Sequence, residues 1–224
     1  MNLKEITIKR RTIKEYDTTK NLSKKEWDEI IDFGHNSPTS MNWQTWRAIV
    51  VDRDSRTADL ITEKHMFYNA KHIKMANKTV FYVVPKKEQF EKGELQRKRI
   101  AESIHLRSIK KGNPIEIKNI PKELIDEGQQ GINSWLNNKE LEPWAAKQSY
   151  IGASFMVIAA ASLSIDTTIM EGFNSKSLDD LFISNELINK DETISLAVSF
   201  GHRSSLPVAP TMRDPKKYKF KNAK

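Results

Sequence analysis

The sequence predicts a three-layer domain of the α/β or α+β class, in which a β-sheet lies between layers of helices. Segments typical of helices and of strands alternate along the chain, and the helical segments cover more residues than the strands. With 224 residues, the chain suits one large domain or two small ones and buries enough surface to fold without disulfides or metal. No internal repeat and no low-complexity linker interrupts the alternation.

The first part of the chain contains four expected helices and two expected strands. Ser23 begins the second helix, because the spacing Ser23-Lys-Lys-Glu26 is that of a capping box. The stretch 36–40 breaks that helix, and Pro85 ends the second strand, the most apolar of the chain. The expected helices are Asn2–Arg10, about 23–35, from Asp54 or Ser55 to about Lys64, and around Asn69–Lys78, and the expected strands are Trp46–Val51 and Thr79–Val84.

The second part contains the longest apolar helix. The segment Trp144–Leu163 follows Pro143, a residue favoured in the first helical turn. From Tyr150 onward it is apolar on nearly all faces and rich in small residues, so we expect it to be buried all round and closely packed. The other expected elements are a long polar helix at Lys87–Lys111, helices at Pro121–Trp135 and Lys176–Ile183, strands at Asp166–Ile169 and Thr193–Phe200, a turn at Met170–Phe173, and a tail without a core pattern.

Composition excludes several classes of protein. Without cysteine, the chain has no disulfide framework, no cysteine-ligated zinc, no iron–sulfur cluster and no thiol nucleophile. Its five histidines lack metal-ligand spacing, so we expect no metal site. The longest apolar stretch is shorter than the roughly 20 residues of a membrane span, and the first eleven residues lack the apolar core of a secretory signal. We therefore expect a cytoplasmic protein without a membrane partner.

The net charge of +8 is unevenly placed along the chain. Residues 1–25 carry eight basic and three acidic side chains, residues 86–111 carry nine and four, and residues 216–224 carry five and none. Three basic blocks indicate anionic ligands, which could be nucleic acid, a membrane surface or a phosphate-bearing cofactor. The block 86–111 is also typical of a solvated helix face.

Three short segments carry groups that could bind a ligand. In an extended segment, Arg10, Thr12 and Lys14 project to one side and could bind a phosphate together. The loop 37–46 carries Asn42 and Gln44, whose amides can bind a polar ring edge, and the turn 169–173 contains a glycine that lets a ligand approach the backbone. Taken alone, each segment is more typical of an ordinary surface turn or capping loop than of a binding site. No Gly-x-Gly-x-x-Gly, P-loop or Gly-x-Ser-x-Gly motif occurs.

Taken together and in order, these segments resemble the motifs of the FMN-dependent nitroreductase family over nearly the whole chain. Arg10-Arg-Thr-Ile-Lys14 resembles the family's RRS-x-(R/K), the stretch 37–46 resembles APSS-x-N-x-QPW, and Met170-Glu-Gly-Phe173 resembles P-x-EGF. Ala145-Ala-Lys-Gln148 opens the long apolar helix as in the family, and Ser199-Phe-Gly-His202 is similar to the family's VGH/GY strand end.

The resemblance implies a fold and an assembly. It implies one α+β domain over residues 1–224, with three layers and a mainly antiparallel central sheet flanked by helices. It further implies an intertwined homodimer with two FMN sites at the interface, each lined by both chains. The tail, about residues 204–224, would then extend over the partner subunit.

The resemblance also implies which residues bind FMN. Arg10, Thr12 and Lys14 would meet its phosphate, ribityl chain and ring, and Ser40 and Asn42 would come from the other subunit. Gln148 would lie near the ribityl or phosphate, and the backbone of Glu171 and Gly172 near flavin N5. The full set of implied cofactor-binding residues is Arg10, Arg11, Thr12, Lys14, Pro38, Thr39, Ser40, Asn42, Asn69, Gln148, Met170, Glu171, Gly172, Arg213 and Lys216.

Departures from the family's motifs mark the expected substrate side. Met41 stands where the family has Thr or Phe, Trp43 replaces a small residue, and Thr45 replaces Pro. His72 stands where some relatives have Lys, and Trp135 is either a lid aromatic that stacks on a planar substrate or an ordinary core residue. We therefore expect Met41, Trp43, His72 and Trp135 to border the substrate.

The activity that the resemblance implies is an NAD(P)H-dependent reduction of nitroaromatics, quinones or related small acceptors. Turnover would be ping-pong, with NAD(P)H delivering hydride to the flavin before the acceptor takes its place. The flavin carries the chemistry, so no side chain is expected as a catalytic residue in the strict sense, and Lys14 and Glu171 would tune it. Two alternatives stay open: a flavin-fold protein acting as a flavin reductase or carrier without nitroreductase turnover, and a basic nucleic-acid-binding module.

Overall fold

The computed structural model of the chain describes residues 2–64, 68–136, 140–206 and 212–220. Helices and strands alternate along the chain as the sequence predicts, and most boundaries agree within a few residues. The elements are α1 (Leu3–Lys9), α2 (Lys24–His35), η1 (Ser40–Asn42), β1 (Arg47–Asp52), α3 (Arg56–Lys64), α4 (Ala70–Met75), β2 (Lys78–Pro85), α5 (Lys87–Glu91), α6 (Glu94–Lys110), η2 (Ile117–Asn119), α7 (Lys122–Leu136), α8 (Leu141–Ser162), β3 (Asp166–Met170), α9 (Ser175–Ser184), β4 (Glu192–Gly201) and α10 (Lys216–Lys219).

The sheet is antiparallel throughout its four named strands, in the order β1-β2-β4-β3. The central strand β2 is apolar and fully buried from Thr79 to Pro85, because both of its faces are covered. Its partner β4 returns from far along the chain and places Val198 opposite Val80. The expected antiparallel sheet is therefore confirmed.

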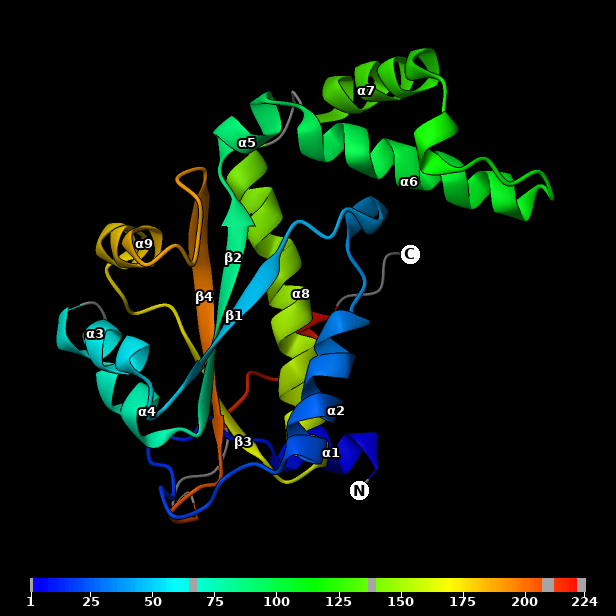
Figure 1. Cartoon of the computed structure of the whole chain (residues 1–224). Coiled ribbons are helices and arrows are strands. Elements are labelled where there is room, and N and C mark those ends of the chain that lie inside the picture. Colours follow the sequence, from blue (N-terminus) through cyan, green and yellow to red (C-terminus); the bar gives the residue numbers. More distant parts are fainter. Residues whose placement is uncertain (1, 65–67, 137–139, 207–211, 221–224) are drawn as a thin grey trace.

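Helices cover both faces of the sheet, which gives the three expected layers (Figure 1). On one face, α3, α4 and α9 enclose a core that includes Ile61, Ile73 and Phe182. On the other face, α2 and α8 pack over Tyr82 and Val198. The strand β3 lies at one edge of this sandwich, next to the segment of residues 10–14 that follows α1 (Figure 1). Below, β3 and this segment together are called the strip.

Helix starts follow the expected capping signals. Ser23 and Glu26 form the predicted capping box at the start of α2, in which each side chain accepts from the other residue's backbone N–H. At α3 the sequence left Asp54 or Ser55 open, and the structure uses Ser55, whose hydroxyl accepts from Ala58 N at 3.2 Å. These capping signals are enough to predict where the helices begin, because each one involves residues within a single helical turn.

The predicted single helix at Lys87–Lys111 is wrong in one respect. It is divided into α5 and α6 at Gly93, which has a φ of +75° in the left-handed region. The division lets Phe90 turn into the core at 2% exposure, while α6 leads away from the body. Together α6 and α7 form a projecting arm, from Glu94 to Leu136, beside the sandwich (Figure 1).

The helix α8 packs closely against the sheet but is not buried all round, contrary to expectation. Its alanines at 159 and 160 are almost fully buried, and a Cβ on Gly152 would lie 2.5 Å from Trp46 Cζ2. In the single chain, however, Ser154 is exposed and Phe155 keeps 37% of its surface exposed. The side of α8 that carries Ser154 and Phe155 is thus open to solvent in the single chain.

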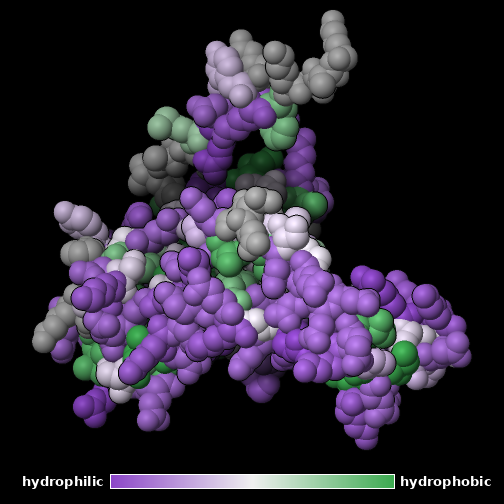
Figure 2. All heavy atoms as spheres, turned by 90° about the horizontal axis from the view of Figure 1, so that it is seen from above, coloured by the Kyte–Doolittle hydropathy of each residue, from purple (hydrophilic) through white to green (hydrophobic). Residues whose placement is uncertain are grey.

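The surface seen from above is mostly hydrophilic, with small hydrophobic patches between the charged side chains (Figure 2). On the arm, Leu106, Ile109 and Leu124 are each more than 40% exposed. No helix in the described residues is long and apolar enough to cross a membrane.

Candidate functional site

The segment after α1 runs alongside the edge strand β3. Thr12 forms a parallel bridge with Thr167, and the backbone N–H of Ile13 donates to Thr167 O at 3.4 Å. The hydroxyl of Thr168 donates to the carbonyl of Ile13 from the neighbouring position. Residues 10–14 are therefore fixed as an extended segment, as the sequence predicts, with Thr12 and Lys14 exposed.

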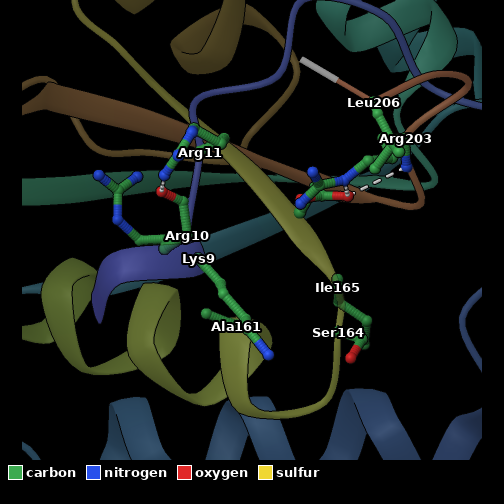
Figure 3. Close-up of a pocket in the computed structure, with 9 residues that line it drawn as sticks. Lys9, Arg10, Arg11, Ala161, Ser164, Ile165, Arg203 and Leu206 are labelled. Carbon is green, nitrogen blue, oxygen red and sulfur yellow. Dashed lines mark hydrogen bonds and ion pairs between the residues drawn. The ribbon is translucent and has the colours of Figure 1, made fainter. Parts of the chain in front are cut away.

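Basic side chains gather where this segment leaves α1. A cavity of about 480 Å³ lies there, and both Arg10 and Arg203 are among the residues that line it (Figure 3). Arg203 is neutralised by a bidentate pair with Asp166, whereas Arg10 forms no ion pair in the described part of the chain. The lining residues are Lys9, Arg10, Arg11, Ala161, Ser164, Ile165, Asp166, Arg203 and Leu206.

Arg10 also lies close to a third guanidinium, from the tail. Its pKa is below the usual value, first because burial disfavours the charged form and then because Arg213 and Arg11 add positive charge nearby. Arg11 itself is turned back onto α1, where its Nη1 donates to Ile8 O at 2.5 Å and Arg10 O at 3.2 Å. Arg10 and Arg213 are thus near enough for their positive charges to repel each other, while Lys216 begins α10.

Lys14 is positioned through its backbone by a buried histidine. The ring of His72 is 2% exposed and hydrogen-bonds the carbonyl of Lys14, while its Nδ1 has no partner among the described residues. The pKa of His72 is lowered by burial and then by the charges of Lys14 and Lys71, so the ring is held neutral. His72 therefore lies beneath the strip and not on the open substrate side where the sequence placed it.

The turn that follows β3 could contact a ligand through its backbone and through the carboxylate of Glu171. Met170 is 3% exposed with its side chain in the core, so any contact it makes with a ligand would come from its main-chain atoms. Gly172 O accepts from Asn69 Nδ2 at 3.0 Å, which joins two predicted residues. Glu171 is exposed and hydrogen-bonds Tyr150, whose pKa is raised to about 12 by burial and by that carboxylate.

The loop between α2 and β1 forms a separate group near the start of α8. The backbone N–H of Ser40 donates to Gln148 Oε1 at 2.8 Å, and Thr39 Oγ1 accepts from Gln44 N at 3.0 Å. Met41, Asn42 and Gln44 all have φ between 48° and 55°, a left-handed conformation that is costly for residues other than glycine. The sequence does not reveal this left-handed backbone, because none of the three residues is a glycine.

The two groups are well apart within one chain. Ser40 is bonded to Gln148, while Arg10 shares its cavity with Ala161, thirteen residues further along α8. At about 1.5 Å per helical residue, the two points are roughly 20 Å apart along the helix. The structure therefore brings Arg10 near Arg213 and Asn69 near Gly172, but it does not bring Ser40 to Arg10.

Three of the predicted substrate-side residues share a second cavity, of about 780 Å³, between the arm and the loop 40–43. Met41 is 56% exposed there, whereas Trp43 is 2% exposed and mainly a core residue. Trp135 stacks edge-on against Trp144 with centroids 5.6 Å apart, so its ring is partly core and partly wall. His72, the fourth predicted residue, is not part of this wall.

Sequence reasoning missed Tyr150, Arg203 and all the arm residues of the second cavity except Trp135. The missed residues Leu124, Gly128, Gly131 and Ile132 follow a helical spacing with Trp135, which was a readable sign of a shared face. Tyr150 and Arg203 gave no such sign, because their partners Glu171 and Asp166 are distant in the sequence.

Comparisons with known proteins agree with this arrangement. The sequence pattern described as the nitroreductase family matches residues 8–202. A Staphylococcus aureus USA300 protein assigned by name to the NAD(P)H nitroreductases is 27% identical over 201 residues, which cover 88% of this chain and 85% of that protein. An Exiguobacterium sibiricum structure in complex with FMN has 19% identity, a TM-score of 0.73 and coverage of 100% and 98%. A Streptococcus pneumoniae nitroreductase family structure has 17% identity, a TM-score of 0.72 and coverage of 99% and 100%. The family pattern spans most of the chain and the fold agrees with it, so this chain belongs to the nitroreductase family.

Proposed function

We propose that the protein is an FMN-dependent oxidoreductase that uses NAD(P)H to reduce nitroaromatic, quinone or related small acceptors. The observation that carries this proposal is the strip along β3, which joins basic side chains at one end to the Asn69–Gly172 turn at the other. The names of the family relatives, an NAD(P)H nitroreductase and an FMN complex, support the choice of cofactor and co-substrate.

The residues of the strip fit FMN. Arg10 and Arg213 repel each other in a half-buried place, and an anion between them would remove that repulsion and accept charge-assisted hydrogen bonds. At about 3.3 Å per residue, β3 extends about 15 Å from this point toward Glu171, so a phosphate and a ring system can be held at opposite ends. The exposed Thr12 and Lys14 lie between them.

Each residue then has a role in binding or orientation. Arg10 and Arg213 hold the phosphate, Thr12 holds the ribityl chain, and the ammonium of Lys14 stabilises negative charge that develops beside it. Glu171 is kept in place by Tyr150, which fixes the backbone turn. When bound, FMN supplies the electron transfer itself, taking hydride from NAD(P)H and passing electrons to the acceptor in a ping-pong sequence.

The site is complete only in a homodimer. Ser40 is roughly 20 Å from Arg10 along α8, so Ser40 and Asn42 reach the cofactor only from a second chain. The exposed side of α8 around Phe155 provides a surface for that second chain, and the tail would extend over it. A dimer of this kind, working in the cytoplasm, is the assembly that we propose.

Nucleic-acid binding through the block 86–111 has little support. Five of its nine basic side chains form ion pairs with neighbouring acids, which leaves few of them to contact phosphates. The paired residues are Lys86, Lys87, Lys92, Arg97 and Arg99.

Anaerobic titration of the purified, FMN-reconstituted protein tests the proposal. We expect NADPH or NADH to bleach the visible absorption of the bound flavin, and a nitroaromatic or quinone to restore it. A protein that cannot be reconstituted with FMN would contradict the proposal. A yellow protein that stays oxidised would favour the alternative of a flavin carrier without turnover.

A further inference from the structure

We propose that the cavity between the arm and the loop 40–43 binds a bulky apolar substituent of the electron acceptor, so that the protein favours acceptors with an extended aromatic or alkyl group. This inference rests on the proposed function and names the class of substrate for that site. The cavity is defined by its lining from the loop (Met41, Trp43), from α6 (Arg99, Ile100, Ser103, Ile104, Arg107) and from α7 (Leu124, Glu127, Gly128, Gly131, Ile132, Trp135).

The size of this cavity suits a ligand. Its volume of about 780 Å³ lies within the roughly 300–1,000 Å³ typical of small-molecule sites. It exceeds the basic cavity at Arg10, of about 480 Å³, which is lined by charged groups. A single planar ring would leave much of the larger cavity empty, whereas a ring with an apolar extension would fill it.

The inner wall of the cavity is mainly apolar. Its charged residues either bind other groups of the protein or lie exposed at the rim. The Nε of Arg99 donates to Trp43 O at 2.8 Å, and its Nη1 pairs with Glu102 at 2.6 Å, so this guanidinium is occupied within the protein. Arg107 and Glu127 are exposed at the rim. Aliphatic side chains and the half-buried indole of Trp135 are the main apolar groups on the remaining wall, with the buried Trp43 behind them, and such surfaces select ligands by apolar contact.

Gly131 lines the cavity, and no close packing contact requires a glycine there. Glycine inside a helix costs about 1 kcal/mol relative to alanine. At Gly128 the cost is explained, because a Cβ there would lie 2.8 Å from Ile100 Cγ2 where α6 and α7 meet. At Gly131 a Cβ would meet nothing within 4 Å, and the backbone has no positive φ that requires glycine. Gly131 therefore keeps the wall of the cavity open.

The cavity also adjoins the loop that the proposed function brings to the cofactor. Met41 lines it, and Met41 lies between Ser40 and Asn42, the residues expected at FMN. The left-handed backbone at Met41, with φ 55°, holds its side chain 56% exposed at this boundary. A substituent on an acceptor bound at the cofactor can therefore enter the cavity past Met41.

Acceptor selectivity is the first test. The series consists of 2-alkyl-1,4-naphthoquinones with chains from methyl to nonyl, and kcat/KM is measured for wild type, Gly131→Leu and Gln130→Leu. We expect wild type to favour the long chains, and Gly131→Leu to lower the ratio of kcat/KM for long over short chains on the order of tenfold. The control Gln130→Leu adds the same side chain at an exposed neighbour outside the cavity and should keep the wild-type ratio. No chain-length preference in wild type, or equal ratios in all three proteins, would overturn the proposal.

Equilibrium binding provides a second test that needs no turnover. We expect 2-naphthol, an apolar bicyclic probe, to bind the FMN-reconstituted dimer once per chain by calorimetry, and on the order of tenfold more weakly to Gly131→Leu than to Gln130→Leu. Absence of binding to wild type would overturn the proposal, because another part of the assembly would then fill the cavity. If no acceptor is reduced but 2-naphthol binds as expected, the proposed function fails while the cavity assignment stands.

Discussion

Arg10 shows how a charged residue can be recognised as functional from its surroundings. Its guanidinium is half-buried, lies near two other guanidinium groups, and has no ion pair in the described part of the chain. The neighbouring Arg203 also carries a guanidinium, but this one is paired with Asp166. Side chains that have an internal partner stabilise the fold, whereas a basic group held near like charge is suited to an anionic ligand.

Replacing Arg10 by alanine should weaken FMN binding. The loss of charge-assisted hydrogen bonds to the phosphate is expected to cost about 1.5–3 kcal/mol of binding free energy. Fluorescence titration of apoprotein with FMN measures the dissociation constant. The control Lys25→Ala removes an exposed cation on α2, and an equal affinity for FMN in all three proteins would refute the role of Arg10.

At the residue scale, the sequence predicted binding residues that lie close together in one short segment. It missed features of residues that depend on contacts with distant parts of the chain. The phosphate segment is readable because Arg10, Thr12 and Lys14 alternate within five residues. The burial of Trp43 and His72 is not readable, because it comes from Trp144 and from the Lys14 carbonyl, far away in the sequence. The family resemblance implied that Met170 binds the cofactor, but it could not show that the Met170 side chain lies in the core.

At the scale of elements, glycines in α7 and α8 have opposite reasons for being present. Gly152 in α8 allows close contact with Trp46, while Gly131 in α7 faces open space. We expect Gly152→Ala to lower the free energy of unfolding by about 1–3 kcal/mol through overpacking. We expect Gly131→Ala to raise it by up to about 1 kcal/mol through helix propensity.

Urea denaturation of both variants measures these changes and makes each the control for the other. The same substitution is made in two helices, so a general effect of alanine on helices would shift both in one direction. A stabilised Gly152→Ala protein would show that Trp46 moves aside without cost.

The ion pair between Arg47 in β1 and Glu192 in β4, called the clamp below, should make the free energy of unfolding depend on pH. Glu192 is 7% exposed and accepts two hydrogen bonds from Arg47, at 2.9 and 2.7 Å, and one from Asn189 N. Burial alone would raise the pKa of Glu192, but these hydrogen bonds outweigh it and hold the pKa below the usual value. The clamp therefore contributes stability above a pH of about 4.3, the unfolded value, and loses it as the pH falls through the folded-state pKa.

Unfolding free energies of wild type and Glu192→Gln between neutral and acidic pH test this expectation. We expect wild type to lose more stability than the variant as the pH falls below about 4.3, because the variant has no carboxylate to protonate. Glu91→Gln, which removes a surface pair with Lys87, serves as the control. Parallel curves for wild type and Glu192→Gln would contradict the assignment.

Element boundaries were predictable where one turn of chain determines them. The capping box at Ser23 and the buried strand ending at Pro85 were read correctly. The division at Gly93 was missed, because the surrounding residues 87–111 are uniformly polar and helical in pattern. The left-handed turn at Gly93 accompanies the burial of Phe90 against Trp144, with ring centroids 6.2 Å apart, and Trp144 is distant in the sequence.

At the scale of the whole molecule, the layered antiparallel fold could be predicted from the sequence. The exposed part of α8 could not. Alternation of helix and strand predicts the layers, since each element must bury one face. The same pattern predicts α8 to be buried all round, yet Phe155 remains exposed in one chain. A pattern of apolar residues does not distinguish burial within a chain from burial between chains.

The order of the sheet also has a consequence for biosynthesis. The two central strands, β2 and β4, are neighbours in space, but β2 ends at Pro85 and β4 begins only at Glu192. At about 5–20 residues per second, a ribosome needs roughly 5–20 s to make the intervening chain. During that interval the apolar strand β2 lacks the partner strand β4, so the nascent chain exposes an apolar strand edge of the kind that favours aggregation.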